Sequence, residues 1–368
     1  MPHSTESTDD ASEDRHVDEA SVHRRVEDSS EDRHVDDASV LRRVEDAKRG
    51  SGVAVLIPCY DEALTIGKVV DDFRSALPLA DVYVYDNNST DGSAEIARAH
   101  GAIVRTEPLQ GKGNVVRQMF RDVQADYYLM VDGDDTYPAE AAPELIAPLA
   151  RGVADMSVGD RLSNGTYGKE NDRALHGFGN DLIRWLIKVI YGYSFADVMT
   201  GYRAFARPFV KTMPVLSEGF QVETEISIHA VDRKWRIADV PVDYRKRPEG
   251  SVSKLSTFSD GAAVLLAITT LFRSYRPMAF FGWLALVLVA LGLVVGVPVV
   301  VEFMYTHAVD RFPSALLAVA LVLCGALSMT VGLVLDTVAK SYRKQWEIDV
   351  YREYERWTSV GATSTHRP

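Results

Sequence analysis

The stretch VAVLIPCYDEALTIGK, residues 53–68, decides the fold. Its first six residues form a short apolar run rich in β-branched side chains, which is typical of a strand buried on both faces. Three polar residues then lead into a helical pattern that extends to about residue 76: Tyr60, Asp61 and Glu62. A buried strand followed directly by a helix is the opening unit of an α/β sheet.

The same alternation continues as far as residue 134. Three strand patterns and two helical patterns follow in turn, with strands at 81–86, 102–106 and 126–134 and helices near 93–101 and 112–123. This order predicts an α/β fold with a doubly wound, mostly parallel sheet. Ligands of such sheets bind beyond the carboxyl ends of the strands. Polar residues gather at those ends, at positions 60–62, 86–91 and 132–135.

The segment Asp132-Gly133-Asp134 is the sharpest chemical feature, because it directly follows the apolar strand pattern YYLMV. The two carboxylates offer hard oxygen ligands to Mg²⁺ or Mn²⁺ and leave coordination positions open. Open positions suit a diphosphate, whose charge the metal neutralises as the nucleotide departs. A surface turn is the alternative for an isolated Asp-x-Asp, but the position after a buried strand favours a metal site.

Further segments carry a family resemblance. IPCYDEALTIG at 57–67 resembles the Pro-x-Tyr-Asn-Glu opening of family-2 glycosyltransferases, with Asp61 where Asn is usual. YDNNSTDGS at 85–93 resembles their Asp-Asp-Gly-Ser-x-Asp-Gly turn. Three later segments resemble the dolichol-phosphate mannosyltransferase branch of polyprenyl-phosphate glycosyltransferases: DVMTGYRAF at 197–205, GFQVETEISIHA at 219–230 and RPEGSVSKL at 247–255. The resemblance implies a GT-A fold.

The resemblance also implies roles for individual positions. Four residues would bind the nucleotide, the last of them through its base or ribose: Pro58, Tyr60, Glu62 and Asp86. Asp132 and Asp134 would hold the metal and the donor diphosphate. Some members have a Gln ligand where Thr136 stands, so that ligand is not implied here. Lys112, in the segment GKGN, could reach the donor diphosphate, although a plain helix-start loop explains it equally well.

A phosphate acceptor is expected on chemical grounds. A phosphate monoester is largely ionised at neutral pH, because its second pKa lies near ~6. It therefore needs positioned cations more than a general base. The cations that should return to the site, with one further donor, are Arg161, Arg203, Arg247, Lys254 and Ser253. We expect Asp134, Arg203 and Glu223 to act in catalysis, with Glu223 orienting the sugar hydroxyls or pairing with Arg203.

Two long apolar segments, Met278–Met304 and Phe312–Val338, follow Arg276. Each exceeds the ~20 residues that cross a hydrocarbon core, and the short loop between them predicts a hairpin. Basic residues flank both outer ends, which by the positive-inside tendency predicts that the preceding domain is cytoplasmic. The alternative, two buried core helices of a soluble domain, fits this length and apolarity poorly. The sequence thus predicts a multi-pass protein of the cell membrane that contacts the lipid bilayer.

The first 50 residues are acidic and repetitive. Residues 13–28 recur at 31–46 with two changes, and the segment holds 15 Asp and Glu against 8 Lys and Arg. The repeat is too short and too charged to form a core, which predicts a disordered tail. A chain with a formal net charge of -12 does not suggest nucleic acid as a partner.

These patterns divide the chain into five parts. They are a disordered acidic tail (1–50), a GT-A glycosyltransferase domain (51–258), an interfacial amphipathic helix (259–276), a transmembrane hairpin (277–340) and a cytoplasmic tail (341–368). A second helix with a broad apolar face is expected at 181–193. Its pattern alone fits a protein core equally well, but the adjoining hairpin favours contact with the membrane surface.

The combined prediction is a metal-dependent, inverting transfer of one hexose-type sugar. The donor would be a UDP- or GDP-linked sugar, and the acceptor polyprenyl or dolichyl phosphate at the cytoplasmic membrane face. The sequence lacks the Gln-x-x-Arg-Trp signature of processive synthases, which argues against polymerisation. One alternative is transfer to a hydroxyl of a lipid-linked sugar or glycolipid, which would need an essential acidic base. The other is a membrane scaffold with a degenerate transferase domain, which the intact Asp132 and Asp134 disfavour.

Overall fold

A mixed seven-stranded sheet forms the centre of the globular domain. The computed structural model describes residues 37–163, 184–219, 221–248, 269–270 and 272–364. The strands are β1 (Val53–Cys59), β2 (Asp81–Asp86), β3 (Ile103–Thr106), β4 (Tyr127–Met130), β5 (Met156–Asp160), β6 (Arg203–Ala206) and β7 (Ile237–Pro241). Their order is β3-β2-β1-β4-β6-β5-β7. Among these strands β6 is antiparallel to both neighbours and the other pairs are parallel. The predicted mostly parallel α/β sheet is confirmed.

Helices cover both faces of this sheet. One face carries α3 (Ile66–Ala76), α4 (Ser93–Ala99), the short turn η1 (Ala139–Ala141) and α6 (Ala142–Ala150). The other face carries α5 (Lys112–Asp122), α9 (Arg207–Thr212) and α10 (Val222–Asp232). Side chains of β1 alternate between the two cores, because successive strand residues point to opposite faces: Val55 and Ile57 pack on one side, Leu56 on the other.

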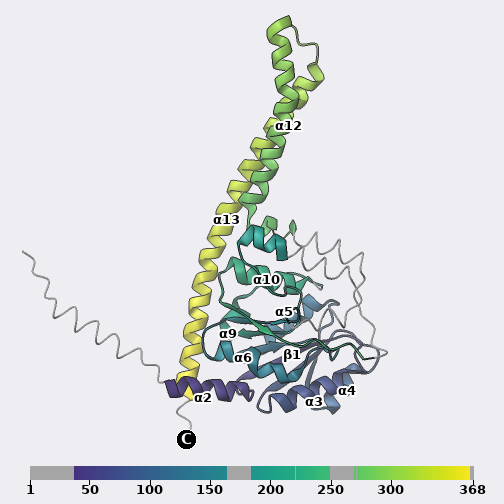
Figure 1. Cartoon of the computed structure of the whole chain (residues 1–368), viewed down its shortest axis with the longest axis vertical. Helices are drawn as coiled ribbons and strands as arrows, with labels where there is room; N and C mark the ends of the chain where they lie inside the picture. Colours follow the sequence, from purple (N-terminus) through teal and green to yellow (C-terminus); the bar gives the residue numbers. More distant parts are fainter. Residues whose placement is uncertain (1–36, 164–183, 220, 249–268, 271, 365–368) are drawn as a thin grey trace, which may run out of the picture.

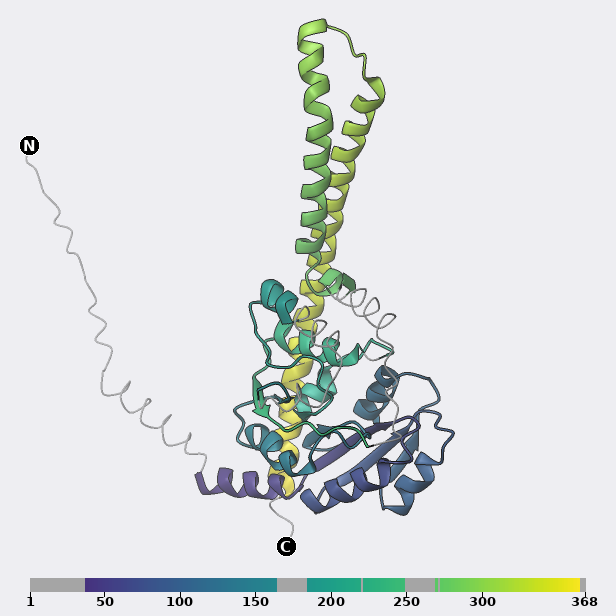
Figure 2. The same ribbon diagram turned by 45° about the vertical axis from the view of Figure 1, so that its right-hand side comes forward.

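The C-terminal part forms a helical hairpin that projects from the globular domain. Its two helices are α12 (Pro277–Thr306) and α13 (Phe312–Ser364), and they lie side by side in Figures 1 and 2. Both are long and apolar enough to cross a membrane. Their large apolar side chains are mostly exposed, Trp283 among them, so the protein itself supplies no core around this part.

Helix α13 does not end with its apolar part but continues along the globular domain (Figure 1). The Trp346 indole donates to the Thr212 carbonyl at 3.1 Å, and Arg207 pairs with Glu353 at 2.8 Å. Trp357 donates to Asp126 at 2.8 Å. The boundary predicted at residue 340 therefore falls inside a continuous helix, and the part of it between Arg343 and Trp357 packs on the domain.

The predicted disordered tail also requires a correction. Residues 37–48 form helix α2 (Asp37–Lys48), which packs against α6. Val44 and Ala47 are buried in the same core as α3 and α6. Residues three apart share one helix face. Val44 and Ala47 therefore form a small apolar face that packs in the core with α6 and with Trp357 of α13. Residues 1–36 lie outside the described part of the chain.

The two predicted amphipathic helices are described only in part. Residues 184–191 are helical, with Ile187 buried and Trp185 and Val189 exposed. This pattern gives one face to the domain core and leaves an aromatic and apolar face outside. For the helix predicted at 259–276, residues 259–268 and 271 lie outside the described part.

Candidate active site

The loops after β1 and β2 are joined by hydrogen bonds into one unit at the carboxyl edge of the sheet. The Asp61 amide donates to Ser89 Oγ at 2.9 Å and the Glu62 amide to Ser93 Oγ at 2.8 Å. In return the Thr90 amide donates to Asp61 Oδ1 at 2.7 Å. The predicted nucleotide residues Pro58, Tyr60 and Glu62 stand on this unit, as expected from parallel strands ending at a common edge.

Asp86, at the end of β2, holds a buried oxygen with no partner. Its Oδ2 accepts from the Ser89 amide at 3.3 Å, whereas Oδ1 is buried without a hydrogen bond among the described residues. Buried polar atoms are normally paired, so this unpaired oxygen among the expected nucleotide residues is a candidate ligand contact. This oxygen fits a donor group on a base or ribose.

The two Asn residues that replace the family's Asp-Gly have a structural role. Asn88 adopts a left-handed backbone with φ 66°, a conformation that Asn tolerates in place of Gly. Asn87 donates to the carbonyls of Glu107 and Leu109 at 2.8 Å each, and its Oδ1 accepts from the Gly111 amide at 2.7 Å. Asn87 thus ties the β2 loop to the start of α5, where Lys112 lies.

Asp132 and Asp134 lie at the end of β4, and each is paired with a cation. The Lys112 ammonium contacts Asp132 and also Glu223, the latter at 2.5 Å. Arg247 contacts Asp134 Oδ2 at 2.5 Å. The structure therefore brings together five predicted site residues from four distant segments.

Burial and mutual repulsion of the carboxylates set the electrostatics. Burial, with the charge of Asp132, raises the pKa of Asp134 above its ordinary value, and Arg247 and Thr136 oppose that rise. The Thr136 hydroxyl donates to Asp134 Oδ1 at 2.6 Å. The residue at the position of the family's Gln therefore helps to orient the Asp134 carboxylate. Burial acts to lower the pKa of Lys112, but Asp132 and Glu223 raise it above its ordinary value. Lys112 is therefore fully charged at neutral pH.

The glycines on both sides of Lys112 explain the segment GKGN. A Cβ added at Gly111 or Gly113 would overlap the backbone carbonyls of Glu218 or Ser217. The Gly113 amide donates to the Glu218 carbonyl at 2.9 Å. The segment before α10 can approach only because these two positions lack side chains, and this approach brings Glu223 to Lys112. The Gly-Lys-Gly pattern was the available signal for this contact.

Gly201, in the segment MTGYRAF, has a similar role beside Asp132. A Cβ at Gly201 would overlap the Asp132 carboxylate. The backbone amide of Gly201 donates to the Tyr137 hydroxyl at 3.2 Å. Tyr137 is buried, and its hydroxyl lies 3.3 Å from Thr200 Oγ1. The sequence argument did not identify Gly201 or Tyr137 as site residues. The local signal for Gly201 was its position in the segment MTGYRAF, and we find none for Tyr137.

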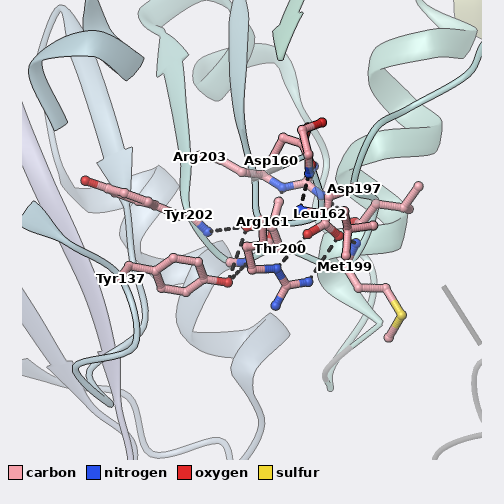
Figure 3. A network of polar contacts seen from close by, with 12 residues as sticks. Tyr137, Asp160, Arg161, Leu162, Asp197, Met199, Thr200, Tyr202 and Arg203 are labelled. Carbon is pink, nitrogen blue, oxygen red and sulfur yellow. Dashed lines mark hydrogen bonds and ion pairs between the residues drawn. The ribbon is translucent and has the colours of Figure 1, made fainter. Parts of the chain in front are cut away.

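The expectation that Arg203 contacts phosphate is contradicted. Arg203 is fully buried on β6, where it donates to the carbonyls of Thr200 at 3.0 Å and Val198 at 2.5 Å. Figure 3 shows it directed at the loop that precedes β6. Burial lowers its pKa to about 10, so it stays charged at neutral pH. Arg203 thus holds the shape of the 197–202 loop. Glu223, which we considered as its partner, forms its ion pair with Lys112.

Arg161 is engaged at the end of β5 (Figure 3). Its Nε and Nη2 donate to the two oxygens of Asp197 at 2.6 and 3.1 Å, a bidentate pair. Its guanidinium also lies 5.5 Å from the ring centre of Tyr244. Arg161 thus anchors the other end of the 197–202 loop. Ser253 and Lys254, predicted to bind the acceptor phosphate, lie outside the described residues.

The donor set at β4 suits a divalent metal held jointly with a ligand. Among the described residues, no group of three or more His, Cys, Asp and Glu side chains could hold an ion by itself. Asp132 and Asp134 supply two hard oxygen donors of like charge at one strand end, and their repulsion favours a bound cation. A diphosphate would complete the coordination, which agrees with the chemistry of Mg²⁺ and Mn²⁺ sites.

The fold and the site define a nucleotide-sugar-dependent glycosyltransferase of the GT-A class. A solved structure with the same fold is glucosyl-3-phosphoglycerate synthase from Mycobacterium tuberculosis in complex with uridine diphosphate, with a TM-score of 0.51. It is 23% identical, and the match covers 62% of this chain and 82% of that one. At this identity the likeness shows the fold alone.

The family follows from the sequence comparisons. Residues 54–213 match the model of Glycosyl transferase family 2. Glycosyltransferase AglJ of Haloferax volcanii is 34% identical over 294 residues, which cover 80% of this chain and 95% of that protein. A dolichyl-phosphate hexose transferase of the same organism is 32% identical over 213 residues, 58% of this chain and 90% of that one. The chain belongs to the family-2 glycosyltransferases, and the predicted resemblance to the polyprenyl-phosphate branch is confirmed.

Proposed function

We propose that this enzyme transfers a single hexose from a nucleotide sugar to a polyprenyl phosphate at the cytoplasmic membrane face, with inversion at the anomeric carbon. The observation that carries the proposal is the meeting of Asp132 and Asp134 with Lys112 and Arg247 at one strand edge. The helical hairpin and the similarity to a dolichyl-phosphate hexose transferase support a lipid acceptor.

The donor is held by the edge formed by β1, β2 and the start of α5. Asp86 offers its unpaired buried oxygen to the base or ribose, and Tyr60 and Glu62 line the same loop. Lys112 faces the position of the diphosphate from the opposite side, where its charge is set by Asp132 and Glu223. These contacts fix the donor before the reaction and so contribute through positioning.

Asp132 and Asp134 would hold a Mg²⁺ or Mn²⁺ ion together with the diphosphate. When bound, the ion neutralises charge on the departing nucleoside diphosphate. Arg247 lies 2.5 Å from Asp134, so its guanidinium stands beside the carboxylate that would hold the ion. The planar fork of an Arg suits bidentate contact with a phosphate of the acceptor.

The acceptor side favours phosphate over hydroxyl. A hydroxyl acceptor needs a general base, and Glu223, the further acid that we expect at the site, is engaged by Lys112. A phosphate oxygen attacks as an anion and needs no base. The lipid phosphate would therefore displace the nucleoside diphosphate in one step, forming the anomeric carbon–oxygen bond as the old one breaks.

The decisive experiment supplies the full-length protein in liposomes with labelled UDP- and GDP-sugars, polyprenyl phosphate and Mn²⁺ or Mg²⁺. The expected product is a lipid-linked monosaccharide that mild acid releases. Chelation of the metal should abolish its formation. Transfer to a glycolipid hydroxyl under the same conditions, with none to polyprenyl phosphate, would establish the hydroxyl alternative instead.

The metal pair can be tested against a neighbouring acid. Asp134→Asn should lower the transfer rate by at least about 100-fold, because a preorganised charge at the leaving group is lost. Asp135→Asn is the matched control, because Asp135 pairs with Lys68 at 2.8 Å on the outside of the same loop. Near-normal transfer by Asp134→Asn, at unchanged thermal stability, would refute the metal role.

A further inference from the structure

A cluster of three arginines lies where the hairpin meets the globular domain. Arg233 follows α10, Arg276 immediately precedes α12, and Arg343 lies on α13. Arg343 Nη2 donates to both oxygens of Asp232 at 3.0 Å. The Nε atoms of Arg233 and Arg276 lie 3.7 and 3.8 Å from the same carboxylate. Three elements distant in sequence thus converge on one acid.

The arginine cluster carries more positive charge and more donors than Asp232 can satisfy. The carboxylate of Asp232 is 1% exposed and faces three guanidinium groups. Glu347 is the other acid that acts on Arg233, so the net charge of the cluster remains positive. Arg233 Nε and Nη1 are buried without a hydrogen-bond partner among the described residues, and so is the Tyr191 hydroxyl. Buried donors of this kind indicate an absent acceptor.

These unpaired groups belong to one local site. The Arg276 guanidinium lies 5.2 Å from the ring centre of Tyr191, and Asp232 is the charged group that acts most strongly on the Tyr191 hydroxyl. Arg233 packs over the Trp346 ring at 4.9 Å, which fixes its guanidinium against α13. The site therefore lies where α10, α12 and α13 meet around a buried acid, and the side chains of Arg276 and Arg343 are 45% and 41% exposed.

The chemistry and the position of this site both point to a lipid phosphate. Arginine forks bind phosphate oxygens through paired hydrogen bonds. Arg276 adjoins Pro277, the first residue of the apolar helix α12, so the cluster lies at the level where the hairpin would enter the hydrocarbon. A phospholipid bound here would place its acyl chains beside α12 and α13 and its headgroup on the arginines.

A lipid in this site is not the acceptor in its reacting position. Glu223 near the start of α10 contacts Lys112, whereas Asp232 ends the same helix. These two residues are separated by roughly 14 Å along the helix axis. Reacting atoms must approach to about 3–3.5 Å. The arginine cluster is therefore a separate site.

We propose that Arg233, Arg276 and Arg343 bind the phosphodiester headgroup of an anionic phospholipid, and that this lipid holds the globular domain against the membrane. The proposal rests on the membrane hairpin of the proposed function. It does not rest on the identity of the sugar donor or acceptor, so the two can fail separately.

The test uses the full chain in nanodiscs of phosphatidylcholine with added phosphatidylglycerol. Binding of labelled phosphatidylglycerol is measured for the native chain and for the double variant Arg276→Gln, Arg343→Gln. Each arginine near an anionic surface contributes roughly fivefold in affinity, so the double variant should bind about 25-fold more weakly. The matched control is Arg352→Gln, since Arg352 is exposed further along α13 and pairs with Asp349; it should bind like the native chain.

The remaining measurements make each outcome decisive. Arg343→Lys keeps the charge and should retain binding within a few-fold, which would separate a binding defect from misfolding. Equal binding by the double variant and the Arg352→Gln control would overturn the proposal, as would displacement of the lipid by inorganic phosphate at a similar concentration.

Transfer to a short-chain acceptor in detergent should be unchanged in the double variant, so a loss of lipid binding with intact transfer supports the separate site. Flotation with neutral vesicles tests the hairpin alone, and failure to float would overturn both proposals.

Discussion

Single atoms decide the geometry around the acidic pair, and the contact between Gly201 and Asp132 is the clearest case. Gly201 leaves just enough room for the Asp132 carboxylate to turn toward Lys112. Its backbone is not in the left-handed region, so the requirement is for space and not for conformational freedom.

Gly201→Ala should therefore impair catalysis more than folding. The added methyl group must displace the Asp132 carboxylate, and a displacement of about 1 Å at a reacting site can cost roughly 100-fold in rate. We expect such a loss in transfer with a small change in melting temperature. Gly282→Ala is the control, because nothing lies within 4 Å of a Cβ at Gly282. Equal activities of the two variants would contradict the steric role.

His229 gives the stability of the protein a defined pH dependence. Burial, with the charge of Arg233, lowers the pKa of His229 from 6.5 to about 3. Between these values the unfolded chain binds a proton that the folded chain does not bind. Stability is therefore lost as the pH falls from 6.5 toward about 3, by up to ~1.4 kcal/mol per pH unit, and is unaffected by this group above 6.5.

The variant His229→Leu should flatten this dependence. Its apparent melting temperature should fall less than that of the native chain over the same pH window, because the leucine cannot bind the proton. Melting curves in detergent at several pH values measure the difference. Parallel curves for the two proteins would show that His229 does not titrate in this way.

The sequence predicted the proximity of residues best where charged positions directly follow buried strands or flank glycines. Asp132 and Lys112 are in contact as these patterns suggest, and Asp134 lies at the same strand end. Their roles in binding the metal and the donor stay predictions. Arg203 was misassigned because an arginine in an apolar motif has the same pattern whether it binds a ligand or backbone carbonyls. The structure separates these cases through the partners of its guanidinium.

Secondary structure elements were predicted where periodicity is local and missed where it depends on a distant partner. The β-α alternation of residues 53–134 is a local signal, and the parallel core follows from it. The antiparallel placement of β6 depends on how the long segment between β5 and β6 returns to the sheet, which no local pattern reveals. The part of α13 after residue 340 has a mostly polar sequence, because the side chains that it buries against the domain are few and widely spaced.

Those few contacts of α13 should still contribute to stability. Trp346 packs against the rings of His229 and Trp235 and donates to the Thr212 carbonyl. Trp346→Ala should lower the free energy of unfolding by about 1–3 kcal/mol, as expected for a partly buried aromatic residue with a hydrogen bond. Tyr351→Ala, at a site 68% exposed on the same helix, is the control and should have little effect. Denaturant unfolding in detergent compares them, and a Trp346→Ala protein as stable as the control would show that this contact is dispensable.

At the scale of the whole molecule, we expect catalysis to reside in the globular domain and membrane attachment in the hairpin. Gly332 of α13 lies close to Pro277 and Phe281 of α12, so a short linker could join the two helices there in place of residues 279–331. Arg343 and Trp346, through which α13 contacts Asp232 and Thr212, lie outside the replaced residues.

Replacing residues 279–331 with a short Gly/Ser linker should yield a soluble enzyme. It should transfer sugar to a short-chain polyprenyl phosphate in solution, because the site and the packed half of α13 are retained. Transfer to the long-chain acceptor in liposomes should fall by at least about tenfold as surface localisation is lost. Loss of both activities would mean that the hairpin shapes the site itself.

We expect the continuity of α13 to make the enzyme sensitive to bilayer thickness. Helix α12 is about 45 Å long at 1.5 Å per residue, whereas a typical hydrocarbon layer measures about 30 Å, and excess length is accommodated by tilting. Because α13 continues from the hairpin along the globular domain without a break, a tilt of the hairpin in the lipid would also incline the globular domain. A thinner membrane would therefore change the angle between the globular domain and the membrane surface.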